Sequence, residues 1–247
     1  MYIESGFSIF GKFPMLESLF LNINTYSPLL PIILFLVFRK SLNQKEGLWV
    51  IFFYCVYSFI NDTVLLGLLS NIIKDGERIF VSLFTLGEFL FFSFYIKNIV
   101  ESKWFKNLVI IISAIFSLFL TVYFFSVEFR FFDSIPVGTE SVLIIAFCIY
   151  YFFEQINKPT ALFIYNTSSF WIIVGFLLYL AGSFFIFIYA SYVPFDEIRK
   201  FWFVTFIFNT LKNVFFSIAI LISYYNNRNK NNNVPNPYVK SREHILN

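Results

Sequence analysis

Seven long apolar segments, each of a length that crosses a lipid bilayer, limit what this chain can fold into. A helix rises about 1.5 Å per residue, so about 20 apolar residues cross the roughly 30 Å hydrocarbon core of a bilayer. Inside that core each segment must satisfy its own backbone hydrogen bonds, which favours helices. Charged residues make up only 13% of the 247 residues, whereas soluble domains carry about 25%. The sequence therefore predicts an all-α bundle of seven transmembrane helices.

The predicted spans follow one another with short connections. Pro14 suits the first position of a helix, and Pro28 and Pro31 predict a kink in the first span. Residues 1–14 form a short extracytoplasmic lead, and the Asn- and Pro-rich residues 226–247 are predicted to form a disordered cytoplasmic tail. The membrane domain covers residues 15–225, with spans at about 15–38, 47–73, 78–100, 105–126, 136–157, 169–192 and 201–225.

The distribution of lysine and arginine predicts the orientation of the bundle. With seven spans, eleven of the 18 basic residues fall on one side of the membrane, six on the other and Lys212 inside it. The side richer in Lys and Arg usually faces the cytoplasm. We therefore expect the N-terminus outside and the C-terminus in the cytoplasm. The abundance of Phe, Ile, Asn and Lys is typical of an AT-rich bacterial coding sequence, which predicts a multi-pass protein of the bacterial cytoplasmic (inner) membrane.

Composition disfavours several kinds of function. The net charge is only +3 and no basic patch recurs outside the loops and tail, which argues against nucleic-acid binding. Cys55 and Cys148 lie in apolar runs and are too far apart for a metal motif, so both are interpreted as packing residues. The only histidine, His244, lies in the predicted tail. We therefore expect no metal, no cofactor and no catalytic residue in the membrane domain.

Four ionisable residues inside the predicted spans carry the functional argument. Lys212 lies near the middle of the seventh span. Asp62 and Glu88 lie at a similar depth in the second and third spans, and Glu140 lies in the outer third of the fifth. Each such group costs on the order of 2.5–3.5 kcal/mol at the bilayer centre, so it usually faces the bundle interior and finds a partner there. We expect Glu88 to pair with Lys212, with Asp62 and Glu140 as the alternatives.

Helical spacing places these residues on inward faces together with other polar groups. Tyr54, Ser58 and Asp62 recur every four residues in the second span. In the seventh span Asn209 shares a face with Lys212, and Asn213 lies on the adjoining edge. The predicted site is a polar cavity that binds a small ligand or a proton, and its residues are Asp62, Glu88, Glu140, Asn209, Lys212 and Asn213.

Two interpretations of this cluster remain open. In one, Lys212 and either Glu88 or Asp62 form a structural ion pair that fixes the register of the helices. In the other, the cluster is a functional site. One ammonium group cannot neutralise three carboxylates, so at least one carboxyl is protonated or exposed to water. A protonatable carboxyl is what a proton-coupled site requires.

Short motifs in four of the spans resemble an uncharacterised family of bacterial seven-span membrane proteins. They are Glu88-Phe89, Glu140 with Tyr150-Tyr151-Phe152, Phe170-Trp171 followed by Gly175, Tyr179 and Gly182, and Lys212-Asn213. The resemblance covers nearly the whole chain. It implies the seven-helix fold and a membrane location, and it brings no established activity.

A second resemblance is to the microbial rhodopsins. It rests on the seven spans, on Lys212 in the middle of the seventh, and on Arg78 followed by Leu83-Phe84-Thr85 in the third. It implies that Lys212 is the lysine that binds retinal. The chain departs from that family at Val81, which stands at the counterion position, and at Phe208, four residues before the lysine. The tryptophans that line retinal in that family are also missing from the middles of the third and sixth spans.

The sequence favours a non-enzymatic receptor or sensor that signals to a separate cytoplasmic protein, because the predicted tail is too short for an output domain. One alternative is a small proton- or ion-coupled transporter. Another is an intramembrane lipid hydrolase with Asp62 and Glu140 as acid and base, which Ser58, Asn61 and Gly87 support through a resemblance to lysoplasmalogenase-type hydrolases. The expected partners are the lipid bilayer, the cytoplasmic signalling protein and, in a homo-oligomer, further copies of the chain.

Overall fold

The computed structural model describes residues 14–43, 46–69, 76–127, 133–158, 161–198 and 201–231. Every regular element in these ranges is a helix, which confirms the all-α prediction. The long helices are α1 (Pro14–Tyr26), α2 (Leu29–Phe38), α3 (Leu48–Ile60), α4 (Gly76–Ile99), α5 (Lys103–Ser126), α6 (Ser134–Ile156), α7 (Ser168–Tyr189) and α9 (Trp202–Asn231). The shorter elements are η1 (Arg39–Ser41), η3 (Asn61–Leu69), η4 (Ala161–Asn166) and α8 (Phe195–Ile198).

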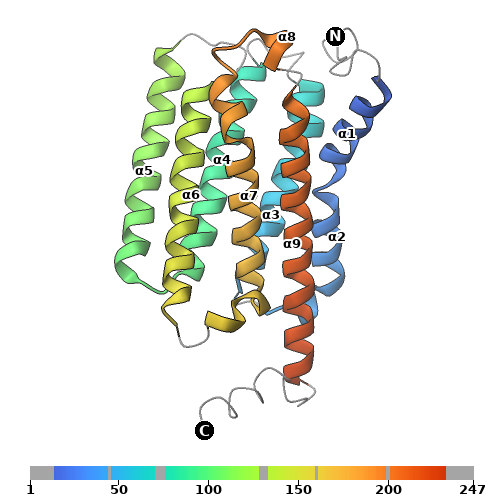
Figure 1. The fold of residues 1–247 in the computed structure, drawn as a ribbon, viewed down its shortest axis with the longest axis vertical. Helices are drawn as coiled ribbons and strands as arrows, with labels where there is room; N and C mark the ends of the chain where they lie inside the picture. The colour runs from blue at the N-terminus through green and yellow to red at the C-terminus, as the bar shows by residue number, and fades with distance from the viewer. Residues whose placement is uncertain are drawn as a thin grey trace.

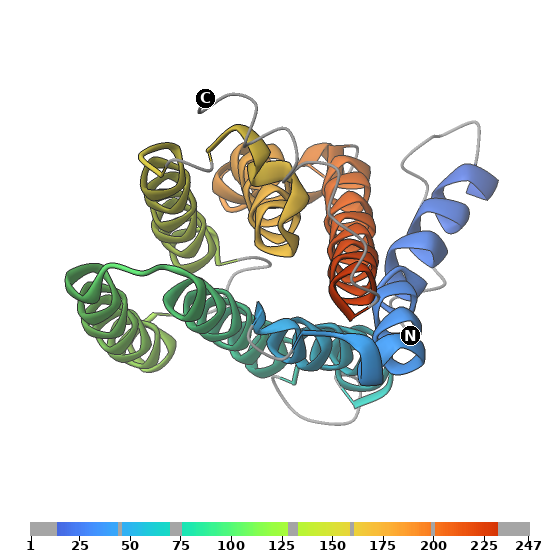
Figure 2. The same cartoon turned by 90° about the horizontal axis from the view of Figure 1, so that it is seen from below.

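The long helices run side by side along the longest axis of the molecule (Figure 1). Seen along that axis, α6, α7 and α9 form one row and α5, α4 and α3 form a second row (Figure 2). The helices α1 and α2 pack against α9, and α2 also packs against α3, so that together they close one side of the bundle. The helix α5 packs mainly against α4 and lies at the periphery. The interior is therefore bounded chiefly by α3, α4, α6, α7 and α9.

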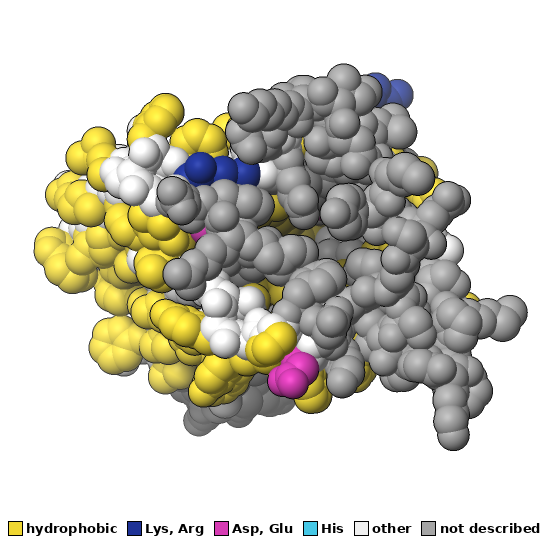
Figure 3. All heavy atoms as spheres, turned by 90° about the horizontal axis from the view of Figure 1, so that it is seen from above, with side chains coloured by type: hydrophobic (Ala, Val, Ile, Leu, Met, Phe, Trp, Pro, Cys, Tyr) yellow, Lys and Arg dark blue, Asp and Glu magenta, His cyan; other side chains and the backbone are white. Residues whose placement is uncertain are grey.

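Seven helical stretches in the described residues are long and apolar enough to cross a membrane. Each of them overlaps one predicted span, and the stretches are Leu19–Ser41, Leu48–Leu65, Arg78–Ile99, Lys103–Ser126, Ser134–Ile156, Ser168–Tyr189 and Trp202–Asn229. Large apolar side chains also cover the outside, and Phe125 on α5 is 81% exposed. Viewed from the end where α4 begins, the described part of the rim is mostly hydrophobic (Figure 3). These properties are those of a multi-pass membrane protein.

The first span is two helices with a break between them, at the place where a kink was predicted. Pro28 has no backbone N–H, so it cannot donate to the carbonyl of Asn24 as a helical residue would. The Ser27 hydroxyl donates to that carbonyl instead, at 2.8 Å. The second proline, Pro31, lies inside α2 and is buried. The break therefore falls at 27–28, and its polar backbone groups are satisfied locally.

The second span changes its helical period, which the sequence did not predict. It is an α-helix to Ile60 and then a π-helix, η3, from Asn61 to Leu69. A π-helix has more residues per turn than an α-helix, so a four-residue spacing no longer returns to the same face. Tyr54 is buried inside the bundle, whereas Asp62 is only half-buried. The helical period therefore changes just before Asp62, and Asp62 is less buried than Tyr54.

The seventh span is longer than predicted. The helix α9 continues to Asn231, so residues 226–231, which the sequence analysis assigned to a disordered tail, are helical. Residues 232–247 of that predicted tail, residues 1–13 of the predicted lead and residues 70–73 of the second predicted span lie outside the described residues. Figure 1 shows α1 at one end of the bundle and the last turns of α9 at the other.

Two glycines on α7 allow α9 to pack closely against it. A Cβ atom added to Gly182 would lie 2.5 Å from the ring of Phe208 on α9, so that the ring packs directly over the glycine. A Cβ atom added to Gly175 would lie 3.4 Å from the backbone carbonyl of Lys212. The prediction that these glycines admit another helix is confirmed, and that helix is α9. Their packing positions α7 beside the lysine.

We predict that Gly182→Ala lowers the melting temperature of the protein in detergent or nanodiscs, because the added methyl group displaces Phe208. Overpacking of this kind costs about 1–3 kcal/mol. The matched control is Gly138→Ala on α6, where the added Cβ atom would meet only Ile188 at an ordinary 3.4 Å. Alanine is about 1 kcal/mol better than glycine in a helix, so the control is expected to be neutral or stabilising. Equal melting temperatures for the two variants would contradict the packing described above.

Candidate functional site

A lysine lies in the middle of the bundle, and its partner is the predicted glutamate. Lys212 on α9 is only 1% exposed, and Glu88 on α4 is 4% exposed. The Lys212 Nζ atom lies 3.3 Å from Glu88 Oε1. The structure therefore confirms Glu88 as the partner of Lys212. An isolated charge at this depth is costly, so each of the two residues can be buried only because the other supplies the opposite charge.

A tyrosine connects the two charged groups. Tyr54 on α3 donates its hydroxyl proton to Glu88 Oε1 at 2.5 Å and accepts a hydrogen bond from Lys212 Nζ, also at 2.5 Å. A second tyrosine, Tyr179 on α7, donates to the other carboxylate oxygen, Oε2, at 3.4 Å. We call these four residues the Lys212 centre. One carboxylate thus holds groups from three other helices, and both of its oxygens accept hydrogen bonds.

Aromatic rings enclose the ammonium group of the Lys212 centre. The Nζ atom lies 3.8 Å from the ring centroid of Tyr179, 4.8 Å from that of Tyr54 and 5.7 Å from that of Phe92. Ring faces attract cations, and the attraction is stronger where water is excluded. The ring of Phe92 is held in turn by Phe176 on α7, at a centroid distance of 3.9 Å. The rings therefore replace part of the hydration that the ammonium loses.

Glu140 lies beside the Lys212 centre but is not bonded to it. This residue on α6 is 1% exposed, and its Oε1 atom has no hydrogen-bond partner among the described residues. Electrostatic interactions connect it with both Glu88 and Lys212. Glu140 therefore belongs to the same polar region, as predicted from its depth, yet one of its carboxyl oxygens is unpaired.

Asp62 lies at the edge of this region, in the π-helix. Its described hydrogen bond is a long one, 3.4 Å, from the side-chain amide of Asn61. The carbonyl oxygen of the Asn61 amide is buried and has no partner among the described residues. Asp62 interacts electrostatically with Lys212 and Glu88 without contacting either. The alternative pairing of Lys212 with Asp62 is thus not the one that the structure has.

The two predicted asparagines of α9 contact the broken first span instead of the Lys212 centre. Asn209 donates to the Asn24 side chain at 2.8 Å, and Asn213 donates to the Ser27 hydroxyl at 2.7 Å. Successive residues of an α-helix point about 100° apart, so Asn213 and its neighbour Lys212 face different helices. The asparagines tie α9 to the break between α1 and α2. They support the helix that carries the lysine.

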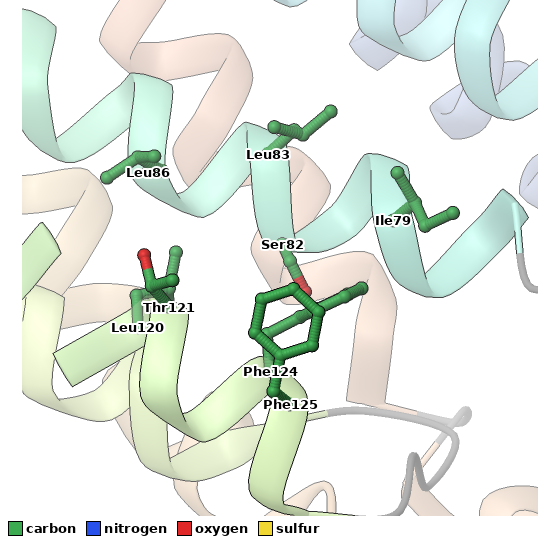
Figure 4. A pocket seen from close by; sticks show the side chains of 8 residues that line it. All are labelled: Ile79, Ser82, Leu83, Leu86, Leu120, Thr121, Phe124 and Phe125. Carbon is green, nitrogen blue, oxygen red and sulfur yellow. The ribbon is translucent and has the colours of Figure 1, made fainter. Parts of the chain in front are cut away.

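Two apolar grooves lie elsewhere on the bundle. One has a volume of about 200 Å³ and lies between α4 and α5, whose side chains face one another across it (Figure 4). Its lining residues are Ile79, Ser82, Leu83, Leu86, Leu120, Thr121, Phe124 and Phe125. The other, of about 400 Å³, lies between α6 and α7. Neither is lined by a residue of the Lys212 centre, so the polar site and these grooves are separate features.

Sequence reasoning missed the two tyrosines of the Lys212 centre as site residues. Tyr54 was placed on an inward face and Tyr179 within a family motif, but neither was assigned to the site. Their signal is weak, because the chain contains 15 Tyr and 39 Phe. A tyrosine at the depth of a buried charge needs a partner for its hydroxyl, and that requirement was the available clue. No group of three or more histidine, cysteine and acidic side chains that could hold a metal ion occurs in the described ranges.

Comparison with known proteins identifies no relative: no protein-family model, no curated protein and no solved structure matches the chain. The resemblances stated from the sequence therefore stay predictions.

We predict that Glu88→Gln destabilises the protein by about 3 kcal/mol, because it leaves the Lys212 charge buried without its counterion. The double variant Glu88→Gln/Lys212→Met should recover most of that loss, since neither charge is then buried. Reversible unfolding in mixed micelles measures both values. Glu197→Gln, at an exposed position after α7, is the control and should leave stability unchanged. A double variant no more stable than Glu88→Gln would show that the pair is not the main electrostatic contact of either residue.

Proposed function

We propose that this protein is a membrane receptor or sensor. The Lys212 centre and its polar surroundings respond to a small ligand or a proton, and the response changes the position of α9. The observation that supports this proposal is that one buried carboxylate, Glu88, holds residues of α3, α7 and α9 at once. Any event that neutralises Glu88 or attracts Lys212 away weakens three interhelical contacts together. We infer two states of this arrangement, one with these contacts made and one with them weakened, because a switch requires two states.

The course of α9 supports a transmitting role. From Lys212 the helix continues without interruption to Asn231, a rise of about 28 Å. Near its end, Asn226 donates to the Asn166 carbonyl at 2.7 Å and Asn227 donates to the Ser41 carbonyl at 2.8 Å. A displacement of α9 at the lysine would strain these contacts at the far end of the bundle. A cytoplasmic signalling partner that binds this end would sense the displacement.

We predict that α9 has two positions whose populations change with pH, the proton being the simplest stimulus. Spin labels at Arg228, on the last turns of α9, and at Lys103, at the start of α5, report the separation; both positions are exposed. Pulsed electron paramagnetic resonance in nanodiscs should give two distances whose proportions differ between mildly acidic and mildly alkaline samples. The two native cysteines, Cys55 and Cys148, are buried and are replaced by alanine first.

The double variant Glu88→Gln/Lys212→Met is the matched control for the spin-label experiment. It should show one distance at every pH, because the charges that define the two states are gone. A single, pH-independent distance in the protein with both charges intact would contradict a switch driven by protons. The Lys212 centre would then stabilise the fold as a structural ion pair and would not respond to pH.

A second candidate function is a small proton-coupled transporter, which the unpaired oxygen of Glu140 favours. A transporter must expose a protonatable carboxyl to both sides of the membrane in turn. Proteoliposomes with an imposed pH gradient and an internal pH-sensitive dye distinguish the two functions. The sensor proposal predicts no proton flux above that of empty liposomes. A proton flux that the Glu140→Gln substitution abolishes would contradict the sensor function and support the transporter function.

We further propose that the protein lies in a bacterial cytoplasmic membrane with the end of α9 in the cytoplasm, following the excess of Lys and Arg on that side. A membrane-impermeant maleimide should label Arg228→Cys in inverted vesicles and not in intact spheroplasts. Glu197→Cys, exposed in the connection before α9, should show the opposite pattern. The reverse result for both positions would invert the proposed orientation.

A further inference from the structure

We propose that Glu140 is the proton-binding residue of the site and that its charge controls the contact between Lys212 and Glu88. The inference rests on the proposed function, because it names the stimulus and the residue that receives it. It explains why a buried carboxyl lies next to an ion pair that is already complete.

The burial and bonding of Glu140 set it apart from the other two carboxyls. Glu88 has the ammonium of Lys212 and two tyrosine hydroxyls, and Asp62 is half-buried with an amide beside it. Glu140 is 1% exposed and one of its oxygens has no partner among the described residues. An ionised carboxylate in such a place loses its hydration without compensation, whereas the neutral acid loses much less. Since one ammonium serves three carboxyls, Glu140 is the one that carries the extra proton.

The titratable groups that interact electrostatically with Glu140 come from four other helices. They are Glu88 on α4, Tyr179 on α7, Lys212 on α9 and Tyr57 on α3. On α5, which touches α6 at its edge, the titratable residue nearest that end of the bundle is Tyr123. Among these groups only Lys212 can be positive. An ionised Glu140 therefore has one cation to attract, and that cation is held by Glu88.

Glu140 and Glu88 compete for Lys212, and the proton on Glu140 decides the strength of the contacts that Lys212 makes. With the proton on Glu140, Glu88 is the sole carboxylate beside Lys212, and the Lys212 centre is intact. When the O–H bond of Glu140 breaks and the proton leaves to water, a second negative charge appears beside the ammonium. Lys212 is then attracted by two carboxylates, and its contacts with Glu88 and Tyr54 weaken. The lysine belongs to α9, so the loss of one proton becomes a force on that helix.

A second titratable carboxyl, that of Asp133, lies at the start of α6. Asp133 directly precedes α6, seven residues or about two turns before Glu140. Burial raises the pKa of the Asp133 carboxyl, and the neighbouring charge of Arg78 offsets part of the rise. Asp133 therefore exchanges protons at a pH closer to neutral than a fully exposed aspartate does. It lies at the start of α6, the end of that helix nearer to Glu140.

Infrared difference spectroscopy of the full chain in nanodiscs tests the assignment, since a protonated carboxyl has a carbonyl band of its own. The protein with all its carboxyls intact should show this band at neutral pH. Glu140→Gln should lose the intensity of one carboxyl, and Glu197→Gln should lose none. If Glu140→Gln fails to fold, Glu140→Asp keeps a carboxyl at the site, and a shift in the band's position then makes the assignment.

Absence of the band at neutral pH, or a band that Glu140→Gln and Glu140→Asp leave unchanged, would overturn the proposal. Either result would leave the proposed sensor function standing, because the spin-label distances on α9 are measured independently of where the proton resides. Conversely, a band assigned to Glu140 with no movement of α9 would keep the proton site and remove its role in signalling.

Discussion

The rest of the structure depends on the contact between the ammonium of Lys212 and the carboxylate of Glu88. An ammonium group at the centre of an apolar bundle has no water, so its helix can occupy this place only when a counterion and polar contacts are supplied by others. Glu88, Tyr54 and Tyr179 supply them from three helices. The requirement is mutual, since Glu88 is just as deeply buried. Burial of two charges thus specifies which helices must meet and at what depth.

The packing around this contact follows from the same need. The helix α7 approaches α9 closely because Gly175 and Gly182 leave room for the backbone and for an aromatic ring. That approach brings the ring of Tyr179 within 3.8 Å of the Lys212 ammonium. On the other side, Asn213 and its hydrogen bond to Ser27 tie α9 to the break in the first span. The Lys212 centre, the close packing of α7 and the hydrogen bond to the break in the first span therefore all position α9. The charge state of Glu140 is proposed to affect the position of the same helix.

Much of this could be predicted from the sequence, and the failures have identifiable causes. Apolar length indicated the seven helices, and the cost of a buried charge indicated that Lys212 needs Glu88. The same reasoning did not predict the π-helix that contains Asp62, because a change of helical period after Ile60 leaves no trace in the pattern of apolar residues. It also placed Asn209 and Asn213 in the polar site, because helical spacing gives the face on which a side chain lies but not the helix that it contacts. Tyr54 was not predicted as a site residue because a hydropathy pattern does not distinguish the hydroxyl of a tyrosine from an apolar ring.

The most direct test of this account is the distance between the two buried charges in a bilayer. Solid-state magnetic resonance on protein with ¹⁵N in lysine side chains and ¹³C in glutamate carboxyls measures the dipolar coupling between Lys212 and Glu88. Assignment uses the loss of the signal in Lys212→Met. The account predicts a strong coupling, consistent with the 3.3 Å between Nζ and Oε1. A coupling too weak to detect, in protein shown to be folded, would contradict it.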